Sequence, residues 1–334
     1  MPRPVTLSWE GRTARGSDLD ARPPKRTWST ADGVGWLLQG DNLPVLRHLA
    51  ATHAGAITLA YLDPPFFTNR AHEAKLRKEG APRTERTRAF AFDDRWSDMP
   101  AYLEALGPRL DAIRPLLGAH GSVVVHVDPK TSHYVRVLGD EIFGAAAFAS
   151  EIVWRYRRWP SKTPNFQRVH DVLLRWRKDP RGRPRWNQTY EPLAASTLAT
   201  WGTKKQRAVV GKDGRRVRSS STEERTDGVP MGDVWDIGIL APVSRERTGF
   251  PSQKPEALLA RLVAALTDPG DIVLDPYAGS GTTLAVARRL GRGFVGIDDG
   301  DVAIATMRKR LGAMGVDLRT STLHGRRDAA IITA

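Results

Sequence analysis

A short stretch of the sequence, Asp63-Pro64-Pro65-Phe66, joins an acidic side chain to a rigid backbone. The amino nitrogen of adenine or cytosine is a poor nucleophile because its lone pair is delocalised into the ring. A carboxylate at Asp63 and the carbonyl of Pro64 could accept both amino hydrogens, draw the nitrogen towards tetrahedral geometry and localise the lone pair. Two successive prolines would hold that carbonyl rigidly, since each fixes its own φ angle. Phe66 would offer a stacking face for a flipped base, although an Asp-Pro-Pro turn that merely ends a strand is the alternative for this stretch alone.

A second stretch, residues 271–298, is typical of a mononucleotide-binding half-site. A predicted strand leads into a glycine turn at 279–281, where a ligand can approach the backbone beside a helix N-terminus. Asp298 lies 17 residues beyond that turn, close to the spacing that lets a carboxylate reach ribose hydroxyls. The third glycine of a dinucleotide fingerprint is missing, and Asp275 would repel a pyrophosphate. A carboxylate there favours a ligand with an ammonium group, such as the methionine part of S-adenosylmethionine.

Both stretches lie at the ends of predicted strands. Buried strands are predicted from apolar runs at residues 36–38, 57–62, 272–274 and 294–297. Each run is followed by a turn that contains a carboxylate: Asp41, Asp63, Asp275 and Asp298. Ligands bind at the carboxyl ends of the strands in open parallel sheets, so four acidic strand ends on one edge would make a site.

Amphipathic helices alternate with these strands. Apolar residues at helical spacing predict helices at 43–49, 102–117, 134–143, 255–266, 282–290 and 302–311, with Pro255 as a first helical residue. Further strands are predicted at 122–127, 152–156 and 172–176. The alternation predicts a parallel, doubly wound α/β sheet. Residues 1–34 are predicted to be irregular, and residues 68–95 to form a lid, a binding loop or a disordered segment.

The positive charge of the chain is concentrated in one quarter of its length. The net charge is +14 and the isoelectric point about 10.4. Residues 151–230 hold 19 Lys and Arg against 8 Asp and Glu. A coding bias towards arginine would spread the charge evenly, so its concentration favours a polyanionic partner such as nucleic acid. Hydrophobic periodicity is lost over 179–230, which indicates an inserted region.

Two groups of residues in this quarter are candidates for DNA contacts. Three arginines alternate with three aromatic residues: Trp154, Arg155, Tyr156, Arg157, Arg158 and Trp159. They form either a DNA-facing strand or the packing edge of the sheet, and we expect the DNA-facing strand. The second group is expected to contact phosphates and consists of Lys204, Lys205, Arg215 and Arg216.

Several classes of mechanism and location are excluded by what the sequence lacks. Cysteine is absent, which excludes disulfides, thiolate metal sites and base-carbon methylation through a cysteine nucleophile. His126, at a predicted strand end, is interpreted as a core histidine, and we expect no bound metal. No apolar run of about 18 residues occurs, and the N-terminus has no apolar signal segment, so we expect a cytoplasmic protein.

The order of these motifs resembles that of the amino-methylating DNA methyltransferases of bacterial restriction–modification and orphan systems. Within that family the chain is similar to the β-class, in which the catalytic motif precedes the S-adenosylmethionine motif. The resemblance covers residues 36–178 and 232–312. It is carried by residues 40–42, 61–66, 92–96, 121–128, 140–144, 151–154, 250–255 and 275–283.

The resemblance implies a doubly wound, mixed α/β sheet of the S-adenosylmethionine-dependent methyltransferase type, with circularly permuted motif order. The catalytic residues it implies are Asp63, Pro64, Pro65 and Phe66. The cofactor-binding residues it implies are Asp41, Ser252, Gln253, Lys254, Asp275, Gly279, Gly281, Thr282 and Asp298. The basic insertion sits where the family keeps its target recognition domain.

Some features leave alternatives open. Phe66 replaces the commoner Tyr, and Tyr277 replaces the usual Phe, but both keep an aromatic face. After Asp298 the family usually has a hydrophobic residue and Ser, which this chain lacks, so the start of the last helix is left open. The leading Asp63 favours adenine N6 as target. Cytosine N4 methylation uses the same geometry, RNA is a further possible substrate, and a catalytically inactive DNA-binding module is the alternative of another class.

The domain organisation that follows has five parts. They are an N-terminal arm (1–35), a catalytic half (36–178), a target recognition insertion (179–231), a cofactor-binding half (232–315) and a C-terminal tail (316–334). Double-stranded DNA is the expected partner and the nucleoid the expected place in the cytoplasm. A homodimer and a restriction endonuclease or other defence-system partner are further expectations.

Overall fold

The computed structural model describes residues 5–12, 20–76, 87–160, 162, 164–203, 208–218 and 225–322. The chain divides into two compact units, which are described separately below. Unit 1 comprises residues 1–187 and 234–334, and unit 2 comprises residues 188–233.

Unit 1 is built on a ten-stranded sheet with the order β13-β7-β8-β6-β3-β14-β15-β2-β1-β16. The five strands from β6 to β2 run parallel, whereas β8 and β1 are antiparallel to their neighbours. The sheet is therefore mixed, as the family resemblance implies. The strands are β1 (Arg26–Thr30), β2 (Gly35–Gln39), β3 (Ile57–Leu62), β6 (Leu117–Val127), β7 (Phe148–Arg155), β8 (His170–Arg177), β13 (Val234–Asp236), β14 (Ile272–Asp275), β15 (Gly293–Asp298) and β16 (Leu318–Ser321).

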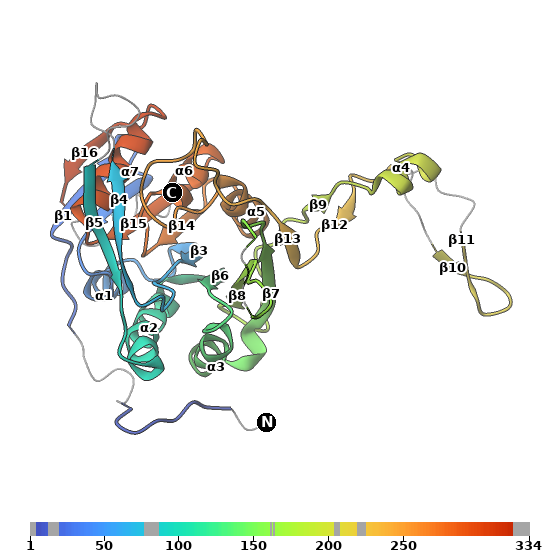
Figure 1. The fold of residues 1–334 in the computed structure, drawn as a ribbon, viewed down its shortest axis with the longest axis horizontal. Coiled ribbons are helices and arrows are strands. Elements are labelled where there is room, and N and C mark those ends of the chain that lie inside the picture. The colour runs from blue at the N-terminus through green and yellow to red at the C-terminus, as the bar shows by residue number, and fades with distance from the viewer. Residues whose placement is uncertain are drawn as a thin grey trace. The chain divides into compact units, whose positions relative to one another are not determined.

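Helices cover both faces of this sheet, which confirms the doubly wound architecture (Figure 1). One layer contains α1 (Asn42–Thr52), α2 (Met99–Ile113) and α3 (Ser132–Phe143). The other contains α5 (Glu256–Leu266), α6 (Thr282–Arg289) and α7 (Asp301–Gly312). Two short 3-10 turns, η1 (Arg114–Leu116) and η2 (Ala145–Ala147), follow α2 and α3.

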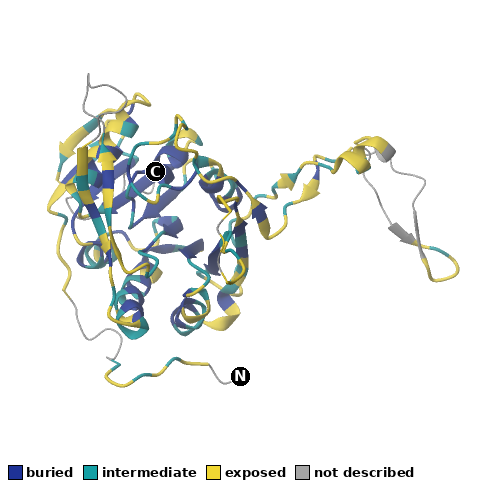
Figure 2. Cartoon of the chain, viewed as in Figure 1, coloured by how far each residue is buried: buried dark blue, intermediate teal, exposed yellow. Residues whose placement is uncertain are grey.

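The central strands form the core and are buried on both faces, as Figure 2 shows. Their sequences are nearly continuous apolar runs, because each side of the strand meets a helix layer. The strand predicted at 57–62 is confirmed at both ends as β3, and the helices predicted at 43–49, 134–143, 282–290 and 302–311 are confirmed with small shifts of their ends.

A hairpin occupies much of the segment that was predicted to be a long loop. Strands β4 (Arg70–Leu76) and β5 (Thr87–Asp94) pair antiparallel in a sheet of their own. Of their described residues only Ala74, Ala91 and Asp94 are buried. The loop prediction is wrong because strands with so few apolar residues give no hydrophobic alternation, and cross-strand pairing leaves no local mark in the sequence.

Other element boundaries also differ from the predictions. Residues 1–34 are not all irregular, since β1 places Trp28 in the core, and β16 lies in the predicted tail. Helix α2 ends at Ile113 and passes into the 3-10 turn η1 around Pro115, which has no backbone N–H to extend the α-helix, and β6 begins at Leu117 rather than at 122. Pro255 has extended geometry and caps α5, so that helix begins one residue later than predicted.

The described residues of unit 2 form short elements. Strand β9 (Tyr190–Glu191) pairs with β12 (Val229–Pro230), and β10 (Ala208–Val210) pairs with β11 (Arg216–Arg218). Helix α4 (Ala195–Trp201) lies between them in sequence. Most of the excess positive charge lies outside this unit, because residues 151–187 of unit 1 hold 11 Lys and Arg against 3 Asp and Glu. Among the described residues, no helix is long and apolar enough to cross a membrane.

Candidate active site

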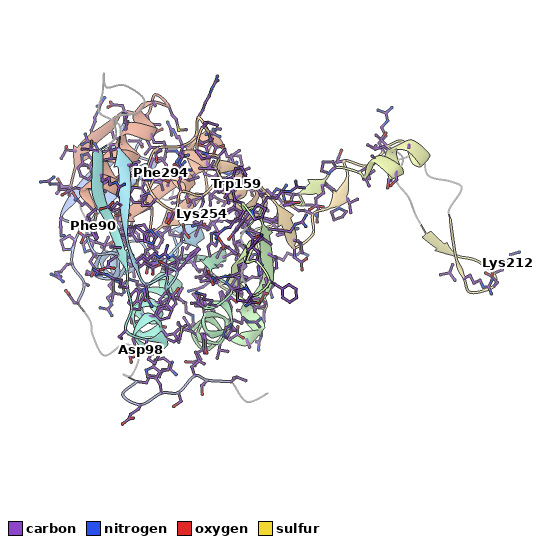
Figure 3. All side chains as sticks on the ribbon, in the orientation of Figure 1. Phe90, Asp98, Trp159, Lys212, Lys254 and Phe294 are labelled. Atoms are coloured by element: carbon purple, nitrogen blue, oxygen red, sulfur yellow. The ribbon has the colours of Figure 1, made fainter. Side chains whose placement is uncertain are left out.

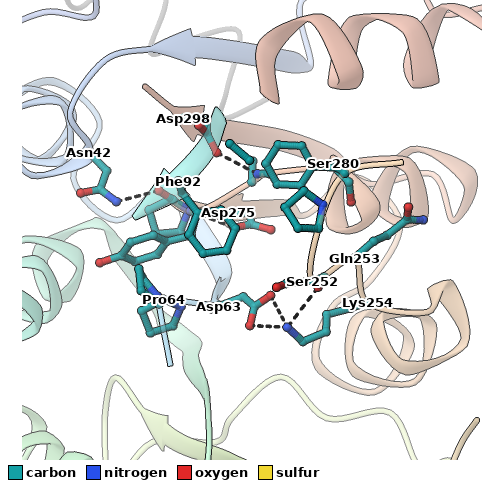
Figure 4. A pocket seen from close by; sticks show the side chains of 18 of the residues that line it. Asn42, Asp63, Pro64, Phe92, Ser252, Gln253, Lys254, Asp275, Ser280 and Asp298 are labelled. Carbon is teal, nitrogen blue, oxygen red and sulfur yellow. Dashed lines mark hydrogen bonds and ion pairs between the residues drawn. The ribbon is translucent and has the colours of Figure 1, made fainter. Parts of the chain in front are cut away.

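A cavity of about 360 Å³ opens at the carboxyl edge of the central strands. Strands β3, β14, β15 and β2 are consecutive parallel neighbours, so their carboxyl ends lie side by side. The four acidic strand ends predicted from the sequence all line the cavity: Asp41, Asp63, Asp275 and Asp298. Figure 4 shows the last three of them. The structure thus brings together the two predicted halves of one site.

The carboxylate of Asp63 is held by Lys254. The Lys254 Nζ atom lies 2.7 and 2.6 Å from the two carboxylate oxygens of Asp63, and 3.3 Å from the carbonyl oxygen of Ser252 (Figure 4). Three acceptors use the three N–H bonds of the ammonium group. A carboxylate oxygen has two lone pairs, so Asp63 can still accept a further hydrogen bond from the cavity. Lys254, predicted as a cofactor residue, therefore also orients the predicted catalytic carboxylate.

The Ser252 carbonyl comes from a strained turn. Ser252 has φ +56°, a left-handed conformation that residues other than glycine rarely adopt. Gln253 holds this turn, because its side-chain oxygen accepts hydrogen bonds from the N–H and hydroxyl of Thr248. Both Ser252 and Gln253 line the cavity, and their predicted cofactor contacts stay predictions.

The aromatic ring of Phe66 faces two cationic or polar groups. Lys254 Nζ lies 4.6 Å from the centroid of the Phe66 ring, and the His126 ring centroid lies 5.3 Å away. Phe66, Pro64 and Pro65 all line the cavity. The predicted catalytic stretch therefore presents a carboxylate, two prolines and an aromatic ring to one space.

A buried polar cluster lies beneath Asp63. His126 is fully buried, with its Nδ1 atom 2.8 Å from the Tyr61 hydroxyl and 3.7 Å from an Asp63 oxygen. Its Nε2 atom lies 3.2 Å from Asp171, which also accepts a hydrogen bond from the Tyr156 hydroxyl at 2.8 Å. Burial would raise the pKa of Asp171, but the hydrogen bond from His126, the positive charges of His126 and Lys254, and the Tyr156 hydrogen bond together outweigh it and lower the pKa. The interpretation of His126 as a buried histidine is confirmed.

On the cofactor side, Asp275 is a buried carboxylate. Burial raises its pKa to about 7, although hydrogen bonds from the Thr283 side chain and the Tyr277 backbone N–H oppose the shift. Among the described residues, no cationic side chain forms an ion pair with Asp275. A carboxylate in this environment suits a ligand that brings its own positive charge, such as an ammonium group.

The glycine turn is shaped by Asp298 and by tight packing. The backbone N–H of Gly279 donates to Asp298 at 2.9 Å, and so does the N–H of Gly300. Gly279 and Gly281 have φ of +47° and +72°. A Cβ atom on Gly281 would lie 2.8 Å from Met307, so only glycine fits there. Burial also raises the pKa of Asp298, to about 6.

The remaining predicted cofactor residues are partly committed to other contacts. Asp41 caps α1 by accepting from the Leu43 N–H, and it pairs with Arg109 at 3.1 Å. The Thr282 hydroxyl contacts Arg310 at 3.0 Å and the Lys254 carbonyl at 3.3 Å. Both Asp41 and Thr282 still line the cavity.

The segment with alternating arginines and aromatic residues is divided between two environments. Trp154 and Tyr156 are only 3% and 4% exposed, so these two rings pack inside the protein, and the expected DNA-facing side of the strand is that of the arginines. Strand alternation points them into the protein, where the Trp154 indole donates to the Ile237 carbonyl at 2.8 Å. Trp159 is 92% exposed (Figure 3).

The arginines of this segment are exposed. Arg155 forms an ion pair with Asp236, and Arg158 lies 5.1 Å over the Tyr156 ring. Arg157 lies beside Arg158 in the segment that follows β7. In unit 2, Arg215 is exposed, whereas Lys204, Lys205 and the side chain of Arg216 lie outside the described residues.

Sequence reasoning missed several residues of the site. Asp171 gave no signal, because it begins a strand and reaches the carboxyl edge only since β8 runs antiparallel. Asp94 lies in a stretch that carried the family resemblance, yet its role was not predicted. Asn42 follows Asp41 directly, and its amide donates to the Pro276 carbonyl at 2.8 Å.

Comparisons with known proteins agree with this arrangement. A family model of DNA methylases matches residues 57–309. Type II methyltransferase M2.DpnII of Streptococcus pneumoniae is 47% identical over 91 residues, which are 27% of this chain and 34% of that protein. DNA adenine methyltransferase YhdJ of Escherichia coli K12 is 26% identical over 263 residues, covering 78% of this chain and 77% of that protein. This chain thus spans about a third of the streptococcal relative and most of the other.

A solved structure shares the fold. The cytosine-N4-specific PvuII DNA methyltransferase superposes with a TM-score of 0.54 at 17% identity, covering 91% of this chain and 92% of that one. The family model spans both the Asp63 loop and the glycine turn, and these two loops line one cavity. The chain therefore belongs to the N6/N4 DNA methylase family, whose S-adenosylmethionine-dependent members methylate the exocyclic amino group of adenine or cytosine in DNA.

Proposed function

We propose that this chain transfers a methyl group from S-adenosylmethionine to the exocyclic amino group of a base flipped out of duplex DNA. One observation carries the proposal. The Lys254-bound carboxylate of Asp63 lines the same cavity as the buried carboxylates of Asp275 and Asp298. A site for an amino group and a site for a cationic nucleotide-like ligand thus share one space.

On the cofactor side, Asp275 would bind the ammonium group of S-adenosylmethionine and Asp298 its ribose hydroxyls. The absence of a described cationic partner for Asp275 supports this fit. When bound, S-adenosylmethionine supplies a methyl group on a positively charged sulfur. Gly279 and Gly281 let the ligand approach the backbone.

On the catalytic side, Asp63 and the Pro64 carbonyl would accept the two hydrogens of the target amino group. This geometry draws the nitrogen lone pair out of the ring and aims it at the methyl carbon. A nitrogen–carbon bond forms as the carbon–sulfur bond breaks, and one amino proton then leaves through Asp63. Phe66 would stack on the flipped base.

We infer adenine N6 rather than cytosine N4 as the target. The leading Asp63 favours adenine in this family, and the relative YhdJ is named a DNA adenine methyltransferase. The PvuII enzyme, which shares the fold, is named as cytosine-N4-specific, so cytosine is the alternative outcome of the test.

The DNA would lie against the exposed arginines Arg155, Arg157 and Arg158, with unit 2 as the target recognition region. The exposed ring of Trp159 beside them supports this placement. The name of the streptococcal relative supports a role in a type II restriction–modification system, with a restriction endonuclease as functional partner. A homodimer stays a prediction, which sedimentation of the full chain tests.

The decisive experiment combines the purified chain, unmodified genomic DNA and S-adenosylmethionine with an isotopically labelled methyl group. Digestion to nucleosides and mass spectrometry should find the label in N6-methyl-2′-deoxyadenosine. Label in N4-methyl-2′-deoxycytidine would overturn the target assignment alone. No label in DNA from the wild-type chain, while calorimetry shows S-adenosylmethionine binding, would overturn the proposed activity. A chain that binds DNA but no S-adenosylmethionine would instead be a DNA-binding module.

A further inference from the structure

The backbone that follows the predicted catalytic residues is bound by one buried carboxylate. Asp94, the last residue of β5, is 1% exposed. Its Oδ2 atom accepts the N–H of Phe66 at 3.1 Å, the N–H of Thr68 at 2.9 Å and the Thr68 hydroxyl at 2.6 Å. Its Oδ1 atom accepts the N–H of Phe67 at 2.8 Å and the indole N–H of Trp96 at 3.2 Å. Three consecutive backbone N–H groups therefore converge on one side chain.

This convergence requires an unusual backbone. Phe67 and Asn69 have φ of +59° and +57°, in the left-handed region that L-residues rarely adopt. Alternation between right- and left-handed residues turns successive N–H groups to one side and creates an anion-binding concavity. Such strained residues persist only where surrounding contacts fix them. Here the carboxylate of Asp94 is the anion that fixes them.

A buried carboxylate is costly unless donors satisfy it. The ion pairs among the described residues include none to Asp94, so its charge is balanced by the five donors above. Hydrogen bonds to an ionised group are stronger than neutral ones. The polar interactions of Asp94 are thus directed at the loop of Phe66 and at its own neighbour Trp96, and not at the core of the fold.

We propose that Asp94 is a positioning residue for the methyl transfer, a role that rests on the function proposed above. It fixes the Phe66 backbone directly, and through it the direction of the ring on which the base stacks. The Pro64 carbonyl lies two residues earlier on the same rigid segment. Misplacing reacting groups by about 1 Å can cost on the order of a hundredfold in rate.

The hairpin that carries Asp94 also touches the other wall of the cavity. The Phe92 and Phe250 rings stack with centroids 6.4 Å apart, and the Lys75 N–H donates to the Gly249 carbonyl at 2.9 Å. Gly249 and Phe250 begin the turn that ends at Lys254. The β4–β5 hairpin therefore connects the loop of Phe66 with the segment that orients Asp63.

The chain offers a matched pair of variants for the test. Asp94→Asn replaces one acceptor oxygen by an amide donor that faces the donors of the loop. Asp93→Asn changes the preceding residue, whose side chain is exposed and bonds Arg95 at 2.8 Å. Thr68→Val removes a single hydrogen bond to Asp94 and keeps the proposal testable should Asp94→Asn fail to fold.

Single-turnover methylation should fall about a hundredfold in Asp94→Asn and a few-fold in Thr68→Val, with Asp93→Asn close to wild type. S-adenosylmethionine affinity, measured by calorimetry, should change less than about twofold in all three. Hydrogen–deuterium exchange of a peptide spanning residues 64–69 should become faster in Asp94→Asn, less so in Thr68→Val, and not at all in Asp93→Asn. Equal losses of cofactor affinity and rate would assign Asp94 a merely structural role and overturn the proposal.

The hydrogen–deuterium exchange measurement also distinguishes a failure of the proposed methyltransferase function from a failure of the positioning role of Asp94. If the wild-type chain methylates no DNA, the proposed function fails, while faster exchange in Asp94→Asn would still report the carboxylate's hold on the loop. If the wild type is active and Asp94→Asn retains its rate, the positioning role fails and the function stands.

Discussion

The two sides of the cavity hold their carboxylates in different ways. Asp298 accepts hydrogen bonds from the backbone of the glycine turn and of its own strand end, and Asp275 from the Tyr277 N–H two residues away. Asp63 is held instead by Lys254, a side chain 191 residues further along the chain. The two carboxylates of the cofactor side are thus held by backbone groups of one continuous segment, and the catalytic carboxylate by a side chain from a distant one.

This difference has a chemical counterpart. Asp275 has no ion-pair partner among the described residues, so a cationic ligand would complete its site. Asp63 already has a cation, so its charge is balanced before any ligand binds, and its remaining lone pairs can direct an amino group. One side is suited to capture a cofactor and the other to orient a reaction, and variants on each side should separate these effects.

The largest expected effect is that of Asp63→Ala. Loss of the hydrogen-bond acceptor should lower single-turnover methyl transfer by about a thousandfold, the upper end of the range seen when one transition-state partner is removed. Calorimetry should find S-adenosylmethionine affinity within a few-fold of wild type. Asp299→Asn, a cavity-lining residue paired with Lys25, serves as control. Equal loss of binding and rate would mean that Asp63 shapes the whole cavity.

The same contrast explains what the sequence could predict. The strand, glycine turn and acidic strand end of 271–298 are contiguous, so spacing alone located Asp275, Gly279 and Asp298 beside one cavity. Asp63 was found because its neighbours Pro64 and Pro65 are unusual. The central parallel strands were found because burial on both faces makes them continuously apolar.

What the sequence could not predict depends on long-range pairing. Asp171 reaches the site only through an antiparallel strand, and Asp94 only through a hairpin with few apolar residues. The Lys254–Asp63 ion pair joins elements from both halves of the chain, so no local pattern encodes it. The charge count over 151–230 did not separate two regions. Most of the excess positive charge belongs to residues 151–187 of unit 1, and the insertion itself is less basic.

A smaller effect is expected from Lys254→Met, which keeps the length of the side chain and removes its charge. Without the ammonium group, both oxygens of Asp63 lose a hydrogen bond, and the carboxylate can rotate. Single-turnover rate should fall about a hundredfold. If Lys254 mainly binds the cofactor, as first predicted, the loss will appear in S-adenosylmethionine affinity and saturating cofactor will restore the rate.

The cofactor side predicts a dependence on pH. Burial raises the pKa of Asp275 to about 7, so the carboxyl group is largely neutral at pH 6 and attracts an ammonium group weakly. S-adenosylmethionine affinity should therefore rise about tenfold between pH 6 and 8, with proton release on binding. Calorimetry in buffers of different ionisation enthalpy measures both.

Asp275→Asn provides the control for this dependence. The variant should bind weakly, and the remaining pH dependence should be centred near 6, the pKa to which burial raises Asp298. If the S-adenosylmethionine affinity of the wild type falls as the pH rises, Asp275 does not bind a cationic group of the ligand. Methyl transfer at saturating cofactor should depend on pH much less, since that step belongs to the other side of the cavity.

The smallest expected effect is that of variants in the proposed DNA-binding segment. They test whether DNA binding is independent of the catalytic and cofactor sides of the cavity. Arg157→Gln combined with Arg158→Gln removes two exposed charges beside Trp159, and each lost phosphate contact should lower the slope of log affinity against log salt by about 0.9. Affinity should therefore drop only a few-fold at moderate salt. Arg319→Gln, on β16 at the opposite edge of the sheet, should leave the slope unchanged. An unaltered slope in the double variant would place the DNA elsewhere. A loss of S-adenosylmethionine affinity would instead mean that Arg157 and Arg158 influence the cofactor side of the cavity.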